Sequence, residues 1–170
     1  MHAEFLVLRL AHVLGGIAWV GFAAYNTIFL IPTLAEAGPA AGPVTAGLQK
    51  RKLFTALPVL ALITIVAGLR LLMLTSDGFS AAYFATRPGL AYAAGAVAGL
   101  VGFVIAMVLT RPSMLRVGAL LATRPGATPD AQRTIDAEVV GLRARASWSG
   151  QLSTATLIVS AAAMAVARYL

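Results

Sequence analysis

Residues 5–32 read FLVLRLAHVLGGIAWVGFAAYNTIFLIP, an apolar run that nevertheless contains Arg9 and His12. A helix of about 20 apolar residues is long enough to cross a bilayer. An ionisable side chain inside such a helix is costly, so it usually marks a functional site. This stretch therefore predicts a membrane span, and it makes His12 the first candidate site residue.

The composition extends this prediction to the whole chain. Of the 170 residues, 59% are hydrophobic and 11% are charged, and the mean hydropathy is +0.86. Further apolar runs occupy residues 53–75, 88–110 and 149–170. These runs lack the alternation of barrel strands, and a helix satisfies its own backbone hydrogen bonds in lipid. The predicted fold class is therefore all-α, an integral membrane four-helix bundle that forms a single domain over residues 1–170.

The distribution of basic residues predicts the orientation. The loop after the first span carries three Lys or Arg residues and the loop after the third carries six, of 13 in the chain. By the positive-inside rule these loops are cytoplasmic, and both termini are periplasmic in the inner membrane of a bacterium. The net charge of +7 then predicts contact with the lipid bilayer and its anionic headgroups rather than with nucleic acid.

The cytoplasmic segment 112–148 is predicted to be largely helical. The apolar residues from Met114 to Leu121 suggest an amphipathic helix along the membrane surface. Thr128-Pro129-Asp130 then has the pattern of a helix start, with a capping hydroxyl, a first-turn proline and an acidic first-turn residue. We therefore expect the fourth helix to begin near Pro129 and to extend into the cytoplasm. Pro32 is expected to end the first helix.

Small residues on two spans predict close helix packing. Transmembrane helices associate through small side chains that let their backbones approach. The expected packing positions are Gly15, Gly16, Ala91, Gly95 and Gly99. Packing within the bundle and packing against another membrane protein require the same close contact, so the sequence leaves both open.

The predicted outer half of the bundle gathers Arg9, His12, Arg70 and Arg168, with Glu4 nearby. In one interpretation the arginines extend to the headgroups and His12 makes a hydrogen bond inside the bundle. In a second, His12 is an axial metal ligand of haem b and the arginines pair with the propionates. In a third, a quinone, lipid or pigment headgroup binds there. The haem interpretation lacks a second intramembrane histidine, which leaves Met73 and Met164 as alternative partners.

Residues 10–21, LAHVLGGIAWVG, carry a histidine, six residues, a tryptophan, one residue and a glycine. This pattern resembles the first helix of small bacterial membrane proteins that include CopD-like copper-resistance proteins and HemJ-type protoporphyrinogen oxidases. The resemblance implies a four-helix membrane fold. In the haem-binding members, it also implies that the position of His12 ligates iron.

The sequence predicts no catalytic residues. No Asp or Glu lies in a span, and the serines of the fourth span have no evident base. The leading prediction is a non-enzymatic accessory or structural subunit that packs against other membrane-protein subunits of a respiratory or photosynthetic complex. The alternatives are a b-type haem-binding redox protein centred on His12, and copper or small-molecule transport.

Overall fold

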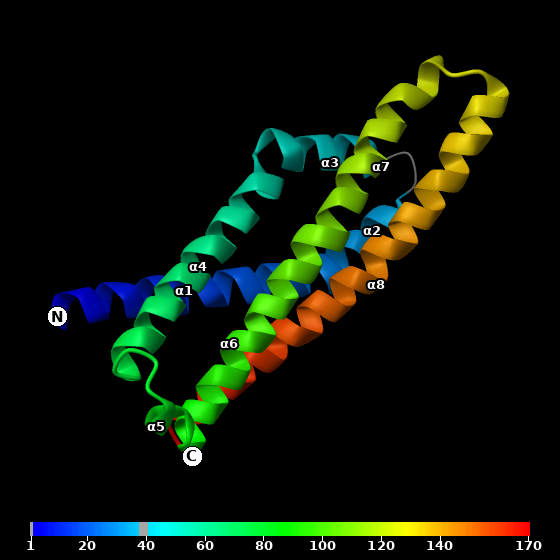
Figure 1. Ribbon diagram of the computed structural model, residues 1–170. Helices are drawn as coiled ribbons and strands as arrows, with labels where there is room; N and C mark the ends of the chain where they lie inside the picture. Colours follow the sequence, from blue (N-terminus) through cyan, green and yellow to red (C-terminus); the bar gives the residue numbers. More distant parts are fainter. Residues whose placement is uncertain (1, 38–40) are drawn as a thin grey trace.

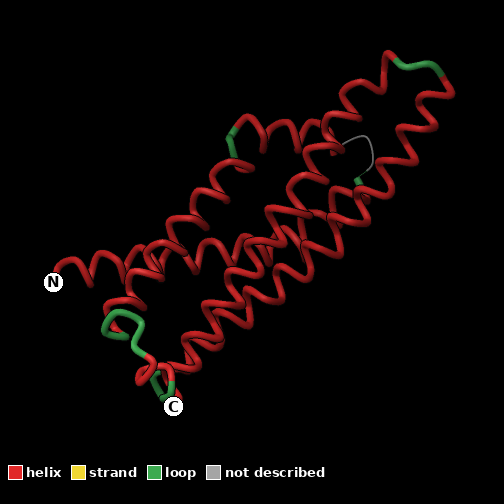
Figure 2. The backbone as a smooth tube through the Cα atoms, viewed as in Figure 1, coloured by secondary structure: helices red, strands yellow, loops and turns green. Residues whose placement is uncertain are grey.

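The computed structural model describes residues 2–37 and 41–170, which form helices joined by short turns and contain no strand (Figures 1 and 2). Four helices of this described part are long and apolar enough to cross a membrane. They are His2–Glu36, Leu53–Thr75, Arg87–Gly126 and Pro129–Ala167. The prediction of an all-helical fold with four long apolar helices is confirmed.

The long helices associate as two pairs. In the first pair, α1 (His2–Tyr25) packs on α4 (Leu53–Thr75); in the second, α6 (Arg87–Ile105) packs on α8 (Pro129–Ala167). Contacts between the pairs are sparser and join α1 to α8 and α4 to α6. In Figure 1 the axes of α4, α6 and α8 are roughly parallel, whereas α1 crosses them.

The first and third spans each contain one turn of π-helix followed by further α-helix: η1 (Asn26–Leu30) before α2 (Ile31–Glu36), and η3 (Ala106–Thr110) before α7 (Arg111–Thr123). The second residue after each π-helix is a proline, Pro32 or Pro112. A proline ring crowds the carbonyl four residues earlier, and the wider turn accommodates it. At the first site Ile31 donates to the carbonyl of Asn26, five residues back. The prediction that Pro32 ends the helix was therefore wrong.

The third span also continues past its predicted end at Thr110, through α7 and a 3₁₀ turn, η4 (Arg124–Gly126). Residues 114–121 thus lengthen this helix and do not form a separate helix along the membrane surface. They pack on the first half of α8 around buried Val117, Leu120 and Val139. We call residues 112–148 the arm. The predicted start of α8 at Pro129 is confirmed, with the Thr128 hydroxyl accepting from the amide of Ala131.

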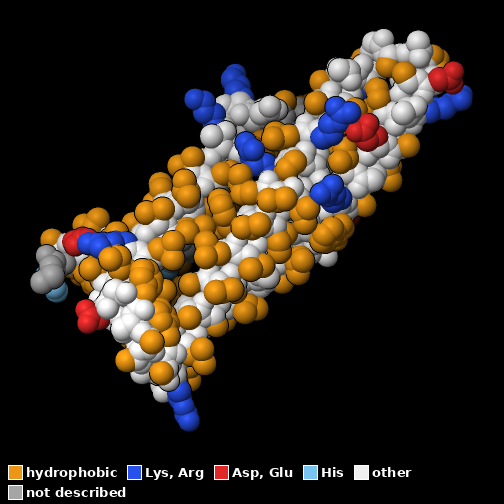
Figure 3. Space-filling view, viewed as in Figure 1, with side chains coloured by type: hydrophobic (Ala, Val, Ile, Leu, Met, Phe, Trp, Pro, Cys, Tyr) orange, Lys and Arg blue, Asp and Glu red, His pale blue; other side chains and the backbone are white. Residues whose placement is uncertain are grey.

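The ends of the molecule differ in chemistry. Both termini lie at one end, together with α5 (Ala81–Phe84), whereas α3 (Ala41–Lys50) and the arm lie at the other (Figure 1). Hydrophobic side chains cover the middle of the face seen in Figure 3, and most of its basic side chains gather around α3 and the arm. This distribution is compatible with helices that cross a membrane.

Candidate functional site

His12 lies on α1 where that helix faces α4, and its Nδ1 atom is 2.8 Å from the carbonyl oxygen of Thr64. A carbonyl oxygen can only accept, so Nδ1 carries the hydrogen and donates it. In the neutral ring the other nitrogen, Nε2, then keeps its lone pair. The geometry therefore fixes one nitrogen in the helix contact and leaves the other able to accept a hydrogen bond or bind a metal.

The imidazole of His12 fits into a gap that Gly68 provides. A Cβ atom on Gly68 would lie 2.5 Å from the ring Cε1 and 2.6 Å from Nδ1, closer than real side chains approach. Gly15, the buried residue of α1, is equally tight against the Thr64 hydroxyl. The α1–α4 contact thus depends on small residues, as expected where no hydrophobic force drives helices together in lipid.

The predicted arginines do not form one site with His12. Arg70 makes an ion pair with Glu4, at 2.8 Å, in which both side chains are about half exposed. Arg168 instead contacts its neighbour Tyr169, whose ring centre is 4.5 Å from the guanidinium carbon. Arg9 is exposed. Within the described residues no hydrogen bond or ion pair joins any of these arginines to His12.

The methionines considered as second iron ligands have contacts of their own. The Met73 sulfur accepts a weak hydrogen bond from Arg70, at 3.7 Å. Met164 packs against Gly95, where an added Cβ would lie 2.8 Å from its Cγ. Outside residues 1 and 38–40, no group of three or more His, Asp or Glu side chains is placed to hold a metal ion.

Of the small residues predicted to pack on the third span, Gly95 and Gly99 face another helix of the same chain. Ser160 of α8 donates to the carbonyl of Gly95, at 2.6 Å, and a Cβ on Gly99 would lie 3.0 Å from the same hydroxyl. Ala91 is half-buried on this helix. Ser153 donates to the carbonyl of Gly102, at 2.8 Å, a packing position that the sequence analysis missed. Gly102 lies seven residues after Gly95, and this helical spacing is a signal that could have revealed it.

Each π-helix is joined to α8 by a hydrogen bond between two side-chain hydroxyl groups. Thr27 of η1 shares a hydrogen bond with Thr154, at 2.9 Å, and Thr110 of η3 shares one with Ser149, also at 2.9 Å. The hydroxyl of Thr154 also lies 3.3 Å from the carbonyl oxygen of Ala23. These contacts make α8 the helix on which the first and third spans meet.

The first span keeps a large face outside these contacts. Only 6% of the residues in its most apolar stretch are buried within the molecule, compared with 33% of those in the corresponding stretch of the fourth span. This face includes the small residues Ala18 and Gly21, and a Cβ added to Gly21 would meet nothing within 4 Å. Exposed Ile17, Phe22 and Tyr25 flank them. The first span therefore exposes small residues next to bulky apolar side chains.

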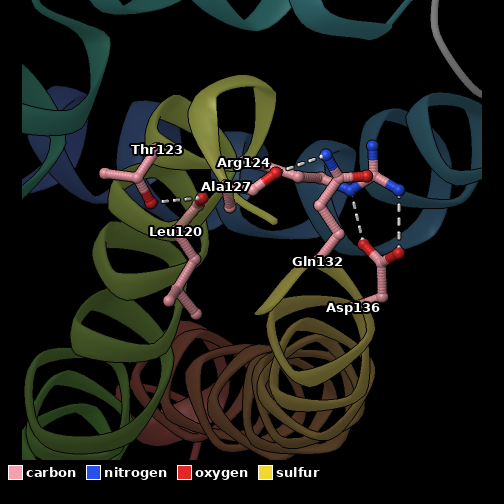
Figure 4. Close-up of polar contacts among 6 residues, drawn as sticks. All are labelled: Leu120, Thr123, Arg124, Ala127, Gln132 and Asp136. Atoms are coloured by element: carbon pink, nitrogen blue, oxygen red, sulfur yellow. Dashed lines mark hydrogen bonds and ion pairs between the residues drawn. The ribbon is translucent and has the colours of Figure 1, made fainter. Parts of the chain in front are cut away.

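The tip of the arm is held by polar contacts (Figure 4). Arg124 donates two hydrogen bonds to the carboxylate of Asp136, at 2.7 and 2.8 Å, and Gln132 donates to the carbonyl of Ala127, at 3.0 Å. The hydrogen bonds from Arg124 lower the pKa of Asp136, and the same contact raises the pKa of Arg124. This paired geometry closes the turn between α7 and α8.

No protein-family model matches the chain, and no curated protein or solved structure was found to be similar to it. The likeness of residues 10–21 to the CopD-like and HemJ-type group therefore stays a prediction. The chain's own geometry carries the functional argument.

Proposed function

We propose that this protein is a non-enzymatic accessory subunit of a larger complex in the inner membrane of a bacterium, with both termini periplasmic and the arm cytoplasmic. The orientation is supported by the basic residues around α3 and the arm, which favour the cytoplasmic side. The spans correspond to residues 5–32, 53–75, 88–110 and 149–170, so the arm, residues 112–148, stands outside the bilayer.

The open face of the first span carries this proposal. A helix that only faces lipid has no need of small residues, whereas a helix that packs against another helix uses them to bring the backbones close. Gly21 and Ala18 supply such a surface in the middle of the span, and residues 2–37 and 41–170 leave it uncovered. We therefore infer that a helix of a partner subunit packs against it. The ridge at Gly95 and Gly99 is already filled by α8.

Site-specific photo-crosslinking in the native membrane tests this proposal. A crosslinker at Gly21 should capture one membrane protein, whereas one at exposed Ala94 on α6 should capture lipid only. Gly21→Leu should also release that partner during purification in mild detergent, and Ala94→Leu should retain it. The proposal fails if position 21 captures no protein, or if Gly21→Leu leaves the same partner bound at full stoichiometry.

A second candidate function, haem binding at His12, is favoured by the orientation of its ring. Histidines that bind metals commonly donate their other ring N–H to a carbonyl, which fixes the tautomer and the ring plane. The contact of His12 with Thr64 has this form. Bound haem b would supply a redox-active iron, and His12 would hold and orient it.

An absorption spectrum separates the two candidates. Protein purified from its native membrane would show a Soret band near one equivalent per chain if His12 ligates haem. His12→Ala should abolish that band while the helical circular dichroism signal persists. A spectrum without stoichiometric haem removes this candidate and leaves the subunit proposal unaffected.

A further inference from the structure

The outer part of the arm is electrically balanced within itself. Between residues 112 and 140 there are three arginines and three acidic residues. Each arginine makes an ion pair with one of them: Arg116 with Glu138, Arg124 with Asp136, and Arg133 with Asp130. This segment therefore has no net charge with which to attract a charged surface.

The base of the arm is different. Arg111, Arg143 and Arg145 are all exposed, and none of them makes an ion pair within the part of the chain that the structure describes. No acidic residue follows Glu138 in the sequence. The unpaired positive charge therefore lies where the arm joins the spans, at Arg143 and Arg145 within the arm and at Arg111 just before it.

Helix register places these arginines at a similar depth. The hydrogen bond between Thr110 and Ser149 aligns the third and fourth spans at this level. Arg111 directly follows Thr110. Arg145 lies one turn before Ser149, and the Ser149 hydroxyl donates a hydrogen bond to the carbonyl oxygen of Arg145, at 2.7 Å. Arg143 is about 3 Å farther along the axis of α8. Trp148, also at this level, is 51% exposed.

A second set of basic residues joins them from the other helix pair. Lys50 ends α3, Arg51 and Lys52 form the turn before α4, and all three are exposed. Figure 1 shows this turn near the level at which α6 passes into α7. The basic residues at this level, which we call the collar, are Lys50, Arg51, Lys52, Arg111, Arg143 and Arg145.

We propose that the collar binds the phosphates of anionic phospholipid headgroups in the leaflet on the side of the arm. Guanidinium groups bind phosphate through paired, charge-assisted hydrogen bonds, and juxtamembrane basic residues attract anionic lipid. The exposed indole of Trp148 suits the same interfacial depth. Arg143 and Arg145 lie on opposite sides of the buried face of α8. The collar therefore contacts lipid at several positions around the protein and does not form a single patch. It fixes the depth at which the arm, whose outer part has no net charge, leaves the membrane.

The test uses the full chain in bilayer nanodiscs with spin-labelled phosphatidylglycerol and spin-labelled phosphatidylcholine. The wild-type protein should prefer phosphatidylglycerol. In the collar variant, Arg111→Gln with Arg143→Gln and Arg145→Gln, this preference should fall by about fivefold. The matched control replaces Arg116, Arg124 and Arg133 by Gln, which removes the same charge from the outer arm and should leave the preference unchanged.

The proposal is overturned if the two triple variants lose the preference equally, because net charge alone would then explain it. It is also overturned if neither variant loses it. Should the collar variant not fold, as judged by circular dichroism, the wild-type protein still provides a test. Its preference must then weaken with added sodium chloride. Inorganic phosphate that displaces the lipid better than chloride at matched ionic strength would support recognition of the headgroup phosphate, and a preference that sodium chloride does not weaken would overturn the proposal.

Discussion

His12 and Gly68 are complementary across the α1–α4 contact: the imidazole occupies the space that a side chain at position 68 would need. The ring also donates to the carbonyl of Thr64, one turn earlier on α4. The single intramembrane histidine therefore has a structural role whether or not its second nitrogen binds anything. Loss of stability on mutation cannot by itself identify a cofactor ligand here.

Gly68→Ala should destabilise the protein by about 1–3 kcal/mol, because the added methyl group must displace the imidazole from a packed contact. Thermal unfolding in detergent, followed by tryptophan fluorescence, measures the change. Gly21→Ala is the matched control, since its Cβ meets nothing within 4 Å. Equal effects of the two substitutions would contradict the fit described for His12.

Gly102→Ala should weaken the α6–α8 pair. Its Cβ would lie 2.6 Å from the Thr156 hydroxyl and 3.0 Å from the Leu157 Cγ, so α8 would have to move. We expect a loss of about 1–3 kcal/mol in unfolding free energy, measured by denaturation in mixed micelles. Gly118→Ala in the arm, where the added atom has open space, should change stability little. A similar loss in both variants would refute the close approach of α6 and α8.

The hydroxyl pair of Thr27 and Thr154 should show energetic coupling. Replacing either threonine by valine removes the hydrogen bond, and replacing both should cost less than the sum of the single changes. The expected coupling is about 0.6 kcal/mol, typical of hydrogen bonds between membrane helices. A double-mutant cycle measures it, with Thr27 and Thr156 as a pair that shares no hydrogen bond in the structure. Additive effects for Thr27 and Thr154 would contradict the contact.

Asp136→Asn should destabilise the arm in a pH-dependent way. Since Arg124 lowers the pKa of Asp136 below the ordinary value of 3.8, the carboxylate contributes stability above that pH and loses it as pH falls through the lowered pKa. Hydrogen exchange at residues 124–136 should therefore be faster in the variant at neutral pH and equal in both proteins in strong acid. Asp77→Asn, outside the arm, should leave this exchange unchanged at every pH. A difference that persists in strong acid would exclude the carboxylate as its source.

The sequence predicted those parts of the fold that depend on local chemistry. Hydropathy located the four spans, and the Thr128-Pro129 pattern located the start of α8. The prediction that Pro32 ends the first helix was wrong because a helix can continue through a proline when its backbone widens locally. Here a π-helical turn makes room for the proline ring. Within the same π-turn, Thr27 contacts Thr154 of α8, a neighbour that lies 127 residues away along the chain.

The candidate site was predicted less completely for a related reason. The location of His12 within a span was evident, but its partners Thr64 and Gly68 are more than 50 residues away along the chain. Sequence alone does not state which helices are neighbours. The grouping of Arg9, Arg70 and Arg168 by depth ignored the crossing of α1, which takes the start of α1 away from the end of α8 (Figure 1).

Each helix pair has contacts of its own. His12 and Gly15 pack α1 against α4, and serines of α8 donate hydrogen bonds to α6. The protein is therefore divisible. A gene split in the turn at Asp77 and Gly78 would encode two polypeptides that each insert as a closed hairpin, and hydroxyl contacts on α8 would rejoin them. Modules of this kind can be exchanged, duplicated or fused to other membrane proteins without redesign of their interiors.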